Sequence, residues 1–257
     1  MKFTFYKYQG TGNDFVIVDN RDLFFPKEDT ALVAKICDRR FGVGADGLLL
    51  LENNPSADFT MVYYNSDGNL STMCGNGGRC IVHFAKFLEI ISKKTTFEAV
   101  DGLHEASVDG NWVSLKMNDI EYVNTSENYT YLNTGSPHHV QLVSNLKAFN
   151  VFAQGKEIRN TIYGKEGSNV NFVEQENPDT FSVRTYERGV EDETLSCGTG
   201  VTAVAIAMFE TGKTSNNNIS LITPGGNLQV SFDKTVKGYE NVYLEGPATQ
   251  VFKGFWR

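Results

Sequence analysis

The feature that most constrains this chain is an internal repeat with a fixed offset of 123 residues. Cys74-Gly75-Asn76-Gly77 precedes one apolar run, and Cys197-Gly198-Thr199-Gly200 precedes another. The same offset relates three further pairs of positions, namely Gly12 with Gly135, Gly44 with Gly167, and Tyr63 with Tyr186. Because several landmarks keep one register, the repeat indicates a duplication and predicts two homologous lobes.

The repeat divides the chain into an N-terminal lobe, residues 1–119, and a C-terminal lobe, residues 120–246. Residues 247–257 lie beyond the second copy and include an apolar segment, which we expect to return to the first lobe as a strand. With 257 residues in total, each lobe is large enough to bury a core of its own.

Most of the hydrophobic periodicity in the first copy is typical of strands, and it covers Phe15–Val18, Leu48–Leu51, Phe59–Tyr64 and Trp112–Leu115. Thr30 is a suitable N-cap for a helix over Ala31–Arg40, which Gly42 would end. The run Val201–Phe209 is apolar on nearly every face and predicts a helix that is buried on all sides. The predicted fold is α+β, with two pseudo-symmetric lobes, each a curled and mostly antiparallel sheet around a central buried helix.

The net charge of −8 argues against nucleic acid and anionic membrane surfaces as partners, because both require a basic face. No apolar run reaches the roughly 20 residues that cross a bilayer, and the first residues lack the apolar core of a signal peptide. We therefore expect a cytoplasmic protein that acts on a small molecule.

The four cysteines form no pair of C-x-x-C motifs, so we expect free thiols, no disulfide framework and no metal site. Cys37 and Cys80 fall inside apolar helical patterns and are expected to be small buried hydrophobes. Cys74 and Cys197 differ from them, because each directly precedes glycines at the start of a predicted helix.

A helix N-terminus stabilises anions, because its first N–H groups lack intrahelical acceptors and the helix dipole is positive there. Cys74 and Cys197 are thus placed where a thiolate is stabilised, and the glycines allow a substrate carboxylate to approach the backbone. If the lobes face each other about a pseudo-twofold axis, the two sulfurs flank one α-carbon. A thiolate and a thiol can then remove a proton from one face and add one to the other, without an electron-sink cofactor.

Four segments resemble the motifs of diaminopimelate epimerases, and together they extend over most of the chain in the family's order. They are Gly10-Thr11-Gly12-Asn13-Asp14-Phe15, Gly42-Val43-Gly44-Ala45-Asp46-Gly47, Asn65-Ser66-Asp67-Gly68 with Cys74-Gly75-Asn76-Gly77-Gly78-Arg79-Cys80, and Glu187-Arg188-Gly189 with Glu193-Thr194-Leu195-Ser196-Cys197-Gly198-Thr199-Gly200. The resemblance implies an isomerase that interconverts LL- and meso-2,6-diaminopimelate in lysine and peptidoglycan precursor synthesis. It also implies catalysis without pyridoxal phosphate or metal, and we further expect a homodimer.

The resemblance implies roles for individual residues as well. The backbone donors expected to hold the carboxylate of the reacting centre are those of Gly75, Asn76, Gly198 and Thr199. The residues expected to bind the distal amino acid are Asn13, Asn65, Asn169, Glu187 and Arg188. The planar guanidinium of Arg188 suits a carboxylate. His138 is implied to lie near the sulfurs.

Two positions depart from the family pattern. Ser136 precedes Pro137-His138 where family members commonly have Asn, and its shorter hydroxyl can still bind substrate through water. Gly47 stands where some members place a Gln that contacts substrate. Both departures concern substrate contacts and neither involves the cysteines.

Three alternatives remain. A related racemase of proline or hydroxyproline uses the same two-thiol chemistry, but its substrate has no distal amino acid for Arg188 to bind. A thiol–disulfide oxidoreductase normally has its cysteines close together as C-x-x-C, whereas these lie 123 residues apart. A binding protein without catalytic activity does not require both thiols.

Overall fold

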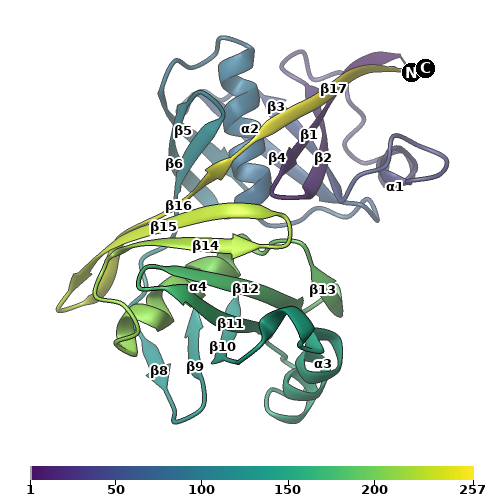
Figure 1. Ribbon diagram of the computed structural model, residues 1–257. Helices are drawn as coiled ribbons and strands as arrows, with labels where there is room; N and C mark the ends of the chain where they lie inside the picture. Colours follow the sequence, from purple (N-terminus) through teal and green to yellow (C-terminus); the bar gives the residue numbers. More distant parts are fainter. Residues whose placement is uncertain (1) are drawn as a thin grey trace. The chain divides into compact units, whose positions relative to one another are not determined.

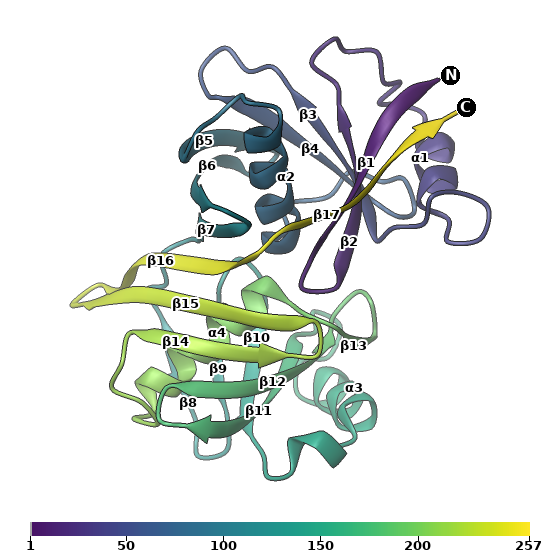
Figure 2. The same ribbon diagram turned by 45° about the horizontal axis from the view of Figure 1, so that its top comes forward.

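The computed structural model describes residues 2–257, and the chain divides into two compact units. The first unit comprises the chain up to Leu115 together with Gly246–Arg257, and the second is Lys116–Glu245. Each unit consists mainly of strands that surround one long helix, as Figures 1 and 2 show. The predicted α+β fold with two lobes is confirmed.

The first unit is a sheet in the order β17-β1-β2-β3-β4-β5-β6-β7 with helices α1 and α2. The pairs β2–β3 and β4–β5 are parallel and the others are antiparallel. The elements are β1 (Phe3–Gly10), β2 (Asn13–Asp19), α1 (Thr30–Cys37), β3 (Gly47–Glu52), β4 (Phe59–Asn65), α2 (Gly75–Phe87), β5 (Lys94–Ala99), β6 (Gly102–Asp109), β7 (Trp112–Lys116) and β17 (Thr249–Trp256). Because α2 contacts both β17 and β6, near opposite edges of the sheet, the sheet curves around this helix.

The apolar tail forms β17, which adds to the first unit. It pairs antiparallel with β1, from Phe3 opposite Trp256 to Gln9 opposite Thr249. The rings of Phe3 and Trp256 stack with their centroids 6.5 Å apart. The two ends of the described chain therefore lie side by side in this unit, as Figure 1 shows.

The second unit repeats this plan in the order β8-β9-β10-β11-β12-β14-β15-β16, with β13 also paired to β12. The pairs β10–β11 and β12–β14 are parallel, like their counterparts in the first unit. The elements are β8 (Val123–Thr125), β9 (Thr130–Asn133), β10 (Pro137–Leu142), the 3₁₀ helix η1 (Leu146–Ala148), α3 (Val151–Thr161), β11 (Asn169–Asn177), β12 (Thr180–Glu187), β13 (Asp192–Thr194), α4 (Gly198–Glu210), β14 (Asn218–Thr223), β15 (Gly226–Thr235) and β16 (Gly238–Pro247).

The backbone follows the sequence repeat closely. Helices α2 and α4 each have 13 residues, and their first and last residues are related by the same offset of 123. The glycines paired by this offset also share a left-handed backbone, with φ of 85° at Gly12 and 103° at Gly135. Such φ values favour glycine, so the duplicated turns explain why glycine recurs at both positions.

The two central helices differ in what they bury. In α4 every residue from Gly200 to Met208 is buried, as predicted for the apolar run Val201–Phe209, and only the last residue of that run, Phe209, is half-buried. Helix α2 is also largely buried, but it carries the charged residue Arg79 into the core with no exposed surface. Among residues 2–257, no helix combines the length and the apolar character that crossing a membrane requires.

Helix α1 differs from its prediction at both ends. Its N-cap is Asp29, whose carboxylate accepts a hydrogen bond from the Leu32 N–H, so Thr30 is the first helical residue. The helix ends at Cys37, three residues before Arg40. Asp38 Oδ1 accepts hydrogen bonds from the N–H groups of Arg40 and Phe41, which satisfies these donors outside the helix. The predicted bounds were wrong because two aspartates, rather than Thr30 and Gly42, set the ends.

Candidate active site

Cys74 is the N-cap of α2, with an extended backbone at φ −107° and ψ 131°. No side chain caps the helix, and the Gly78 N–H donates to the Cys74 carbonyl at 2.7 Å. The earlier N–H groups of a helix have no intrahelical acceptor, so those of Gly75 and Asn76 are suited to bind an anion. The thiol therefore lies at the positive end of a buried helix.

Asn13 and Asn76 meet beside the Cys74 sulfur. The Asn76 amide nitrogen donates to Asn13 Oδ1 at 3.2 Å, and Cys74 Sγ lies 3.6 Å from the same oxygen. The Asn13 amide nitrogen donates to Asp46 Oδ2 at 2.7 Å, which fixes the orientation of this amide. The structure thus brings together four residues from three separate segments of the first unit.

Cys197 is the N-cap of α4 and has nearly the same backbone, with φ −118° and ψ 112°. The Val201 N–H donates to its carbonyl at 3.0 Å, and no side chain caps the helix. Its sulfur lies 3.5 Å from Thr199 Oγ1. The N-terminus of α4 therefore offers Gly198 and Thr199 as backbone donors, in the same way as α2 offers Gly75 and Asn76.

His138 connects Thr199 to the interior of the second unit. Asn171 donates its amide to the His139 carbonyl at 2.9 Å, which identifies Nδ2 as the atom that lies 3.2 Å from His138 Nδ1. His138 Nδ1 is then an acceptor and Nε2 carries the proton, so Nε2 donates to Thr199 Oγ1 at 2.9 Å. Burial, reinforced by the charge of Arg188, lowers the pKa of His138 to about 3. The imidazole is neutral at neutral pH.

A second group of predicted residues meets at the edge where β10 and β11 begin. Asn169 donates its amide to Ser136 Oγ at 2.8 Å and to the Pro137 carbonyl at 3.1 Å. Asn169 Oδ1 accepts the backbone N–H of Arg188 at 2.9 Å. The exposed Arg188 guanidinium donates to the Glu166 carbonyl at 3.0 Å. Ser136 therefore acts in the structure as a partner of Asn169.

Asn65 and Glu187 end the two equivalent strands β4 and β12. Asn65 pairs with Gly47 across the β3–β4 ladder, and Glu187 Oε2 accepts the Thr194 hydroxyl at 2.9 Å. A Cβ at Gly47 would lie 2.5 Å from the Tyr63 ring and 2.6 Å from the Tyr64 carbonyl oxygen. A glutamine at Gly47 would require Tyr63 and this backbone to move, so the departure at Gly47 is linked to the neighbouring tyrosine.

The two remaining cysteines have a different environment. Cys37 and Cys80 are buried, and burial raises the pKa of each thiol to about 12. Neither is at a helix N-terminus, since each lies within a helix. Both therefore remain protonated at neutral pH, as expected for small core residues.

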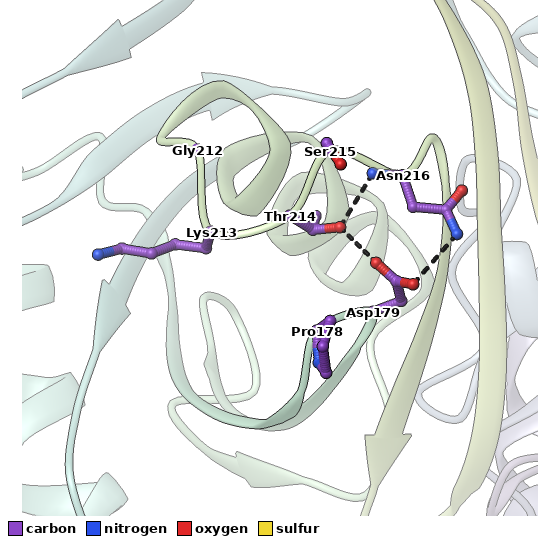
Figure 3. Close-up of a pocket in the computed structure, with 7 residues that line it drawn as sticks. All are labelled: Pro178, Asp179, Gly212, Lys213, Thr214, Ser215 and Asn216. Atoms are coloured by element: carbon purple, nitrogen blue, oxygen red, sulfur yellow. Dashed lines mark hydrogen bonds between the residues drawn. The ribbon is translucent and has the colours of Figure 1, made fainter.

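A surface hollow in the second unit lies at the opposite end of α4 from Cys197. It is formed by the turn Pro178–Asp179 and the loop Gly212–Asn216, as Figure 3 shows. Asp179 accepts hydrogen bonds from Thr214 Oγ1 at 2.6 Å and Asn216 Nδ2 at 3.3 Å, so both carboxylate oxygens are occupied. A helix of this length places the hollow roughly 20 Å from the sulfur. In the described part of the chain, no three His, Cys, Asp or Glu side chains are grouped to hold a metal ion.

Three residues with evident roles around the sulfurs were missed from sequence. Arg79 lies inside a helical motif, where a charged residue is normally assigned to the solvent face. Asn171 lies in an apolar strand, and Asp46 follows a glycine-rich segment. The family motifs contain Arg79 and Asp46, but the spacing gives no indication that they contact Asn76 and Asn13.

Sequence comparison relates nearly the whole chain to one family of enzymes. The family model described as diaminopimelate epimerase matches residues 5–123 and 130–251. The diaminopimelate epimerase of Flavobacterium psychrophilum is 62% identical over 250 residues, which cover 96% of this chain and 98% of that protein. The diaminopimelate epimerase of Chlorobaculum tepidum is 42% identical over 256 residues, covering 95% and 98%.

Solved structures with the same fold are more distant in sequence. A phenazine biosynthesis protein of the PhzF family from Bacillus anthracis matches with a TM-score of 0.81 at 13% identity, covering 100% of this chain and 99% of that one. A hydroxyproline epimerase from Agrobacterium vitis matches with a TM-score of 0.67 at 12% identity, covering 99% and 92%. At these identities the likeness concerns the fold alone.

Proposed function

The chain belongs to the diaminopimelate epimerase family, and we propose that it interconverts LL- and meso-2,6-diaminopimelate by proton transfer at one α-carbon. The family's enzymes are isomerases, and both halves of the chain match the family model. The observation that carries the proposal is the pair of cysteines, Cys74 and Cys197, that begin two equivalent buried helices.

In this mechanism one cysteine is a thiolate and the other a thiol. The thiolate removes the α-proton from one face, and the thiol delivers its own proton to the opposite face, which inverts the carbon. The two residues exchange roles in the reverse direction. Serine would not serve, because its hydroxyl is too weak an acid to be ionised at neutral pH.

The helix N-termini stabilise the negative charge that develops on the substrate during proton transfer. When the α-proton leaves, negative charge moves into the substrate carboxylate. Backbone N–H groups of Gly75, Asn76, Gly198 and Thr199 are suited to stabilise that charge, as donors in an oxyanion hole do. We therefore propose that the reaction requires neither pyridoxal phosphate nor a metal ion.

Diaminopimelate differs from proline in having a second, distal amino-acid group, which the enzyme must recognise. We assign this recognition to Asn13, Asn65, Asn169, Glu187 and Arg188. The cluster of Ser136, Asn169 and Arg188 supports this assignment, because the Asn169 amide binds both the Ser136 hydroxyl and the Arg188 backbone N–H at one edge of the second unit, and the Arg188 guanidinium is exposed. Proline and hydroxyproline have no distal amino-acid group for these residues to bind. We further propose that the enzyme is a cytoplasmic homodimer that serves lysine and peptidoglycan precursor synthesis.

The test is to incubate the reduced, purified protein with LL-diaminopimelate in deuterated water, without added cofactor. Chiral analysis should show meso-diaminopimelate, and early product should carry deuterium at the inverted centre while remaining substrate stays largely protiated. Deuterium is expected because the proton comes from the second thiol, which exchanges with solvent. Lack of epimerisation, or efficient racemisation of proline instead, would refute the substrate assignment. Early product that retains the original hydrogen would refute the two-thiol mechanism.

A further inference from the structure

Arg79 is a fully buried cation on the second turn of α2. Among residues 2–257, no carboxylate lies within ion-pair distance of its guanidinium, and its Nε has no hydrogen-bond partner. Buried charges in proteins are normally paired, because removing an ion from water is costly. An unpaired charge in the core lowers the stability of the fold, so Arg79 is a candidate for a role in the neighbouring site.

The guanidinium ties together two segments that flank Cys74. Its Nη1 donates to the Gly75 carbonyl at 3.3 Å, while Nη2 donates to Asn76 Oδ1 at 2.9 Å and to Thr11 Oγ1 at 3.2 Å. Thr11 has a φ of 49°, which is unusual for a β-branched residue. Gly10 allows the close approach, since a Cβ there would lie 3.3 Å from Nη2. Arg79 therefore links the start of α2 to the turn that precedes Asn13.

These contacts determine which atom faces the Cys74 sulfur. Because Asn76 Oδ1 accepts from Arg79, the Asn76 nitrogen is directed to Asn13 Oδ1. Asn13 donates its own nitrogen to Asp46, so its oxygen lies beside Cys74 Sγ. A series of donors and acceptors thus runs from the buried cation to Asp46 and leaves an acceptor oxygen 3.6 Å from the thiol.

Arg79 also contributes uncompensated positive charge near this thiol. Asp14 is paired with Lys7 and Arg39, and Asp46 is paired with Arg39, so the neighbouring charges largely compensate one another. Burial lowers the pKa of Arg79, while Cys80 and Cys74 act in the opposite direction. Cys80 is too deeply buried to ionise at neutral pH. Cys74 is then the nearby acid whose anion this charge can stabilise.

We propose that Arg79 is a positioning residue for Cys74, which holds the Asn76 and Asn13 amides in place and stabilises the Cys74 thiolate through its buried charge. The proposal rests on the proposed role of Cys74 in proton transfer. A reversible epimerase needs both protonation states of each thiol. The Asn13 oxygen favours the thiol by accepting its proton, and Arg79 together with the helix N-terminus favours the thiolate.

The second unit provides a matched control position. Thr202 stands in α4 where Arg79 stands in α2, displaced by the same offset of 123 residues. It is fully buried, and its hydroxyl donates to the Gly198 carbonyl at 3.0 Å, as Arg79 donates to the Gly75 carbonyl. Thr202→Val therefore removes the corresponding contact without removing a charge.

The experiment compares Arg79→Met, Arg79→Lys and Thr202→Val in the full-length protein. Iodoacetamide labelling across a pH series, read by peptide mass spectrometry, reports Cys74 and Cys197 separately. In Arg79→Met we expect the pH midpoint of Cys74 labelling to rise by about one unit, which slows labelling about tenfold at neutral pH, with Cys197 unchanged. Arg79→Lys should keep the midpoint but lose about tenfold in kcat, with little change in KM, because lysine cannot hold the same contacts. Thr202→Val should leave Cys74 labelling and kcat within about twofold of the unmodified protein.

A purely structural role predicts different results. An Arg79→Met protein with a lower melting temperature but an unchanged Cys74 midpoint would overturn the proposal, as would equal slowing of both cysteines. If Arg79→Met does not fold, Arg79→Lys decides, and an unchanged kcat in that variant would contradict the positioning role. Labelling requires no turnover, so absence of epimerase activity in the unmodified protein would refute the proposed function separately.

Discussion

The two cysteine motifs share a backbone, but different side chains support them. Both cysteines are extended N-caps of buried 13-residue helices. Behind Cys74 lies the buried cation Arg79 with two amides, whereas behind Cys197 lie an apolar helix interior and a neutral histidine, His138. After the duplication, the helix N-terminus was kept in both copies and the residues around the sulfur changed. The geometry that anion binding requires is therefore a property of the backbone, which different side chains can support.

The difference also affects the hydrogen bond that each sulfur receives or makes. Cys74 faces the Asn13 oxygen, which can only accept and so favours the thiol. Thr199 already accepts from His138 Nε2, so its own proton is available to Cys197, which favours the thiolate. The hydrogen bonds at the two sulfurs therefore differ in direction, because the one at Cys74 favours the thiol and the one at Cys197 favours the thiolate.

The largest effect is expected when either sulfur is replaced. Cys74→Ser and Cys197→Ser should each lose at least about 10³-fold in epimerisation, because a serine hydroxyl is a poor acid and base at neutral pH. Chiral chromatography measures the rate, and circular dichroism checks the fold. Cys37→Ala is the control, since this buried thiol lies within α1, and its activity should change by less than about twofold. Near-normal turnover by either serine variant would remove the basis for treating the motifs as a pair.

Much of the fold could be predicted because its signals are local. The offset between the cysteine motifs indicated where two equivalent helices begin, and alternating apolar runs marked strands such as β4. The ends of α1 could not be predicted in this way, because Asp29 and Asp38 compete with the backbone through single side-chain hydrogen bonds.

The supporting residues of the site were less accessible to sequence reasoning. Asn171 contacts His138 although the two are 33 positions apart, and Arg79 contacts Thr11 at a separation of 68. Such pairs form only when strands align in the folded lobe, so their spacing contains no periodic signal. The cysteines were found because helix termini are recognisable locally, whereas their partners depend on tertiary packing.

A smaller but selective effect is expected at His138. His138→Leu removes the donor to Thr199, and we expect about 100-fold lower kcat and slower iodoacetamide labelling of Cys197, because a hydrogen bond that supports a charged group is lost. His138→Gln should retain much of the kcat and of the Cys197 labelling rate, since the glutamine amide can donate a hydrogen bond from a similar position. Cys74 labelling should stay unchanged in both variants, because His138 supports the second motif.

His139 provides the control for this pair. It neighbours His138 but contacts Tyr163 and Tyr129, so His139→Phe tests for general disturbance of β10. Labelling of Cys197 should be unaffected by this substitution. If His138→Leu slowed the labelling of Cys74 and left the labelling of Cys197 unchanged, the inferred difference between the motifs would be wrong.

The smallest effect concerns stability in acid. Burial lowers the pKa of His138 to about 3, against about 6.5 in an unfolded chain. Between these values the unfolded chain binds the proton and the folded protein does not, so stability falls as pH drops below 6.5. From pH 7 to pH 5 this amounts to about 2 kcal/mol for one such histidine. Urea unfolding should therefore show a pH-dependent loss that is about 2 kcal/mol smaller in His138→Gln.

Other groups contribute to acid sensitivity, but the variant isolates one of them. Burial also lowers the pKa of His139 to about 4 and lowers that of His83 in the first unit, and both are present in the parent and in His138→Gln. Asp14 is held ionised by Arg39 and Lys7, with its pKa lowered to about 2, so its contribution to stability is lost only below pH 4. If His138→Gln and the parent lost the same free energy of unfolding between pH 7 and pH 5, the pKa of His138 would be the same in the folded protein and in the unfolded chain, near 6.5. The folded protein would then protonate His138 at pH 5, and the neutral tautomer that directs the Thr199 hydroxyl to Cys197 would exist only at higher pH. Below pH 6.5 the contrast between the two motifs would rest on Arg79 alone.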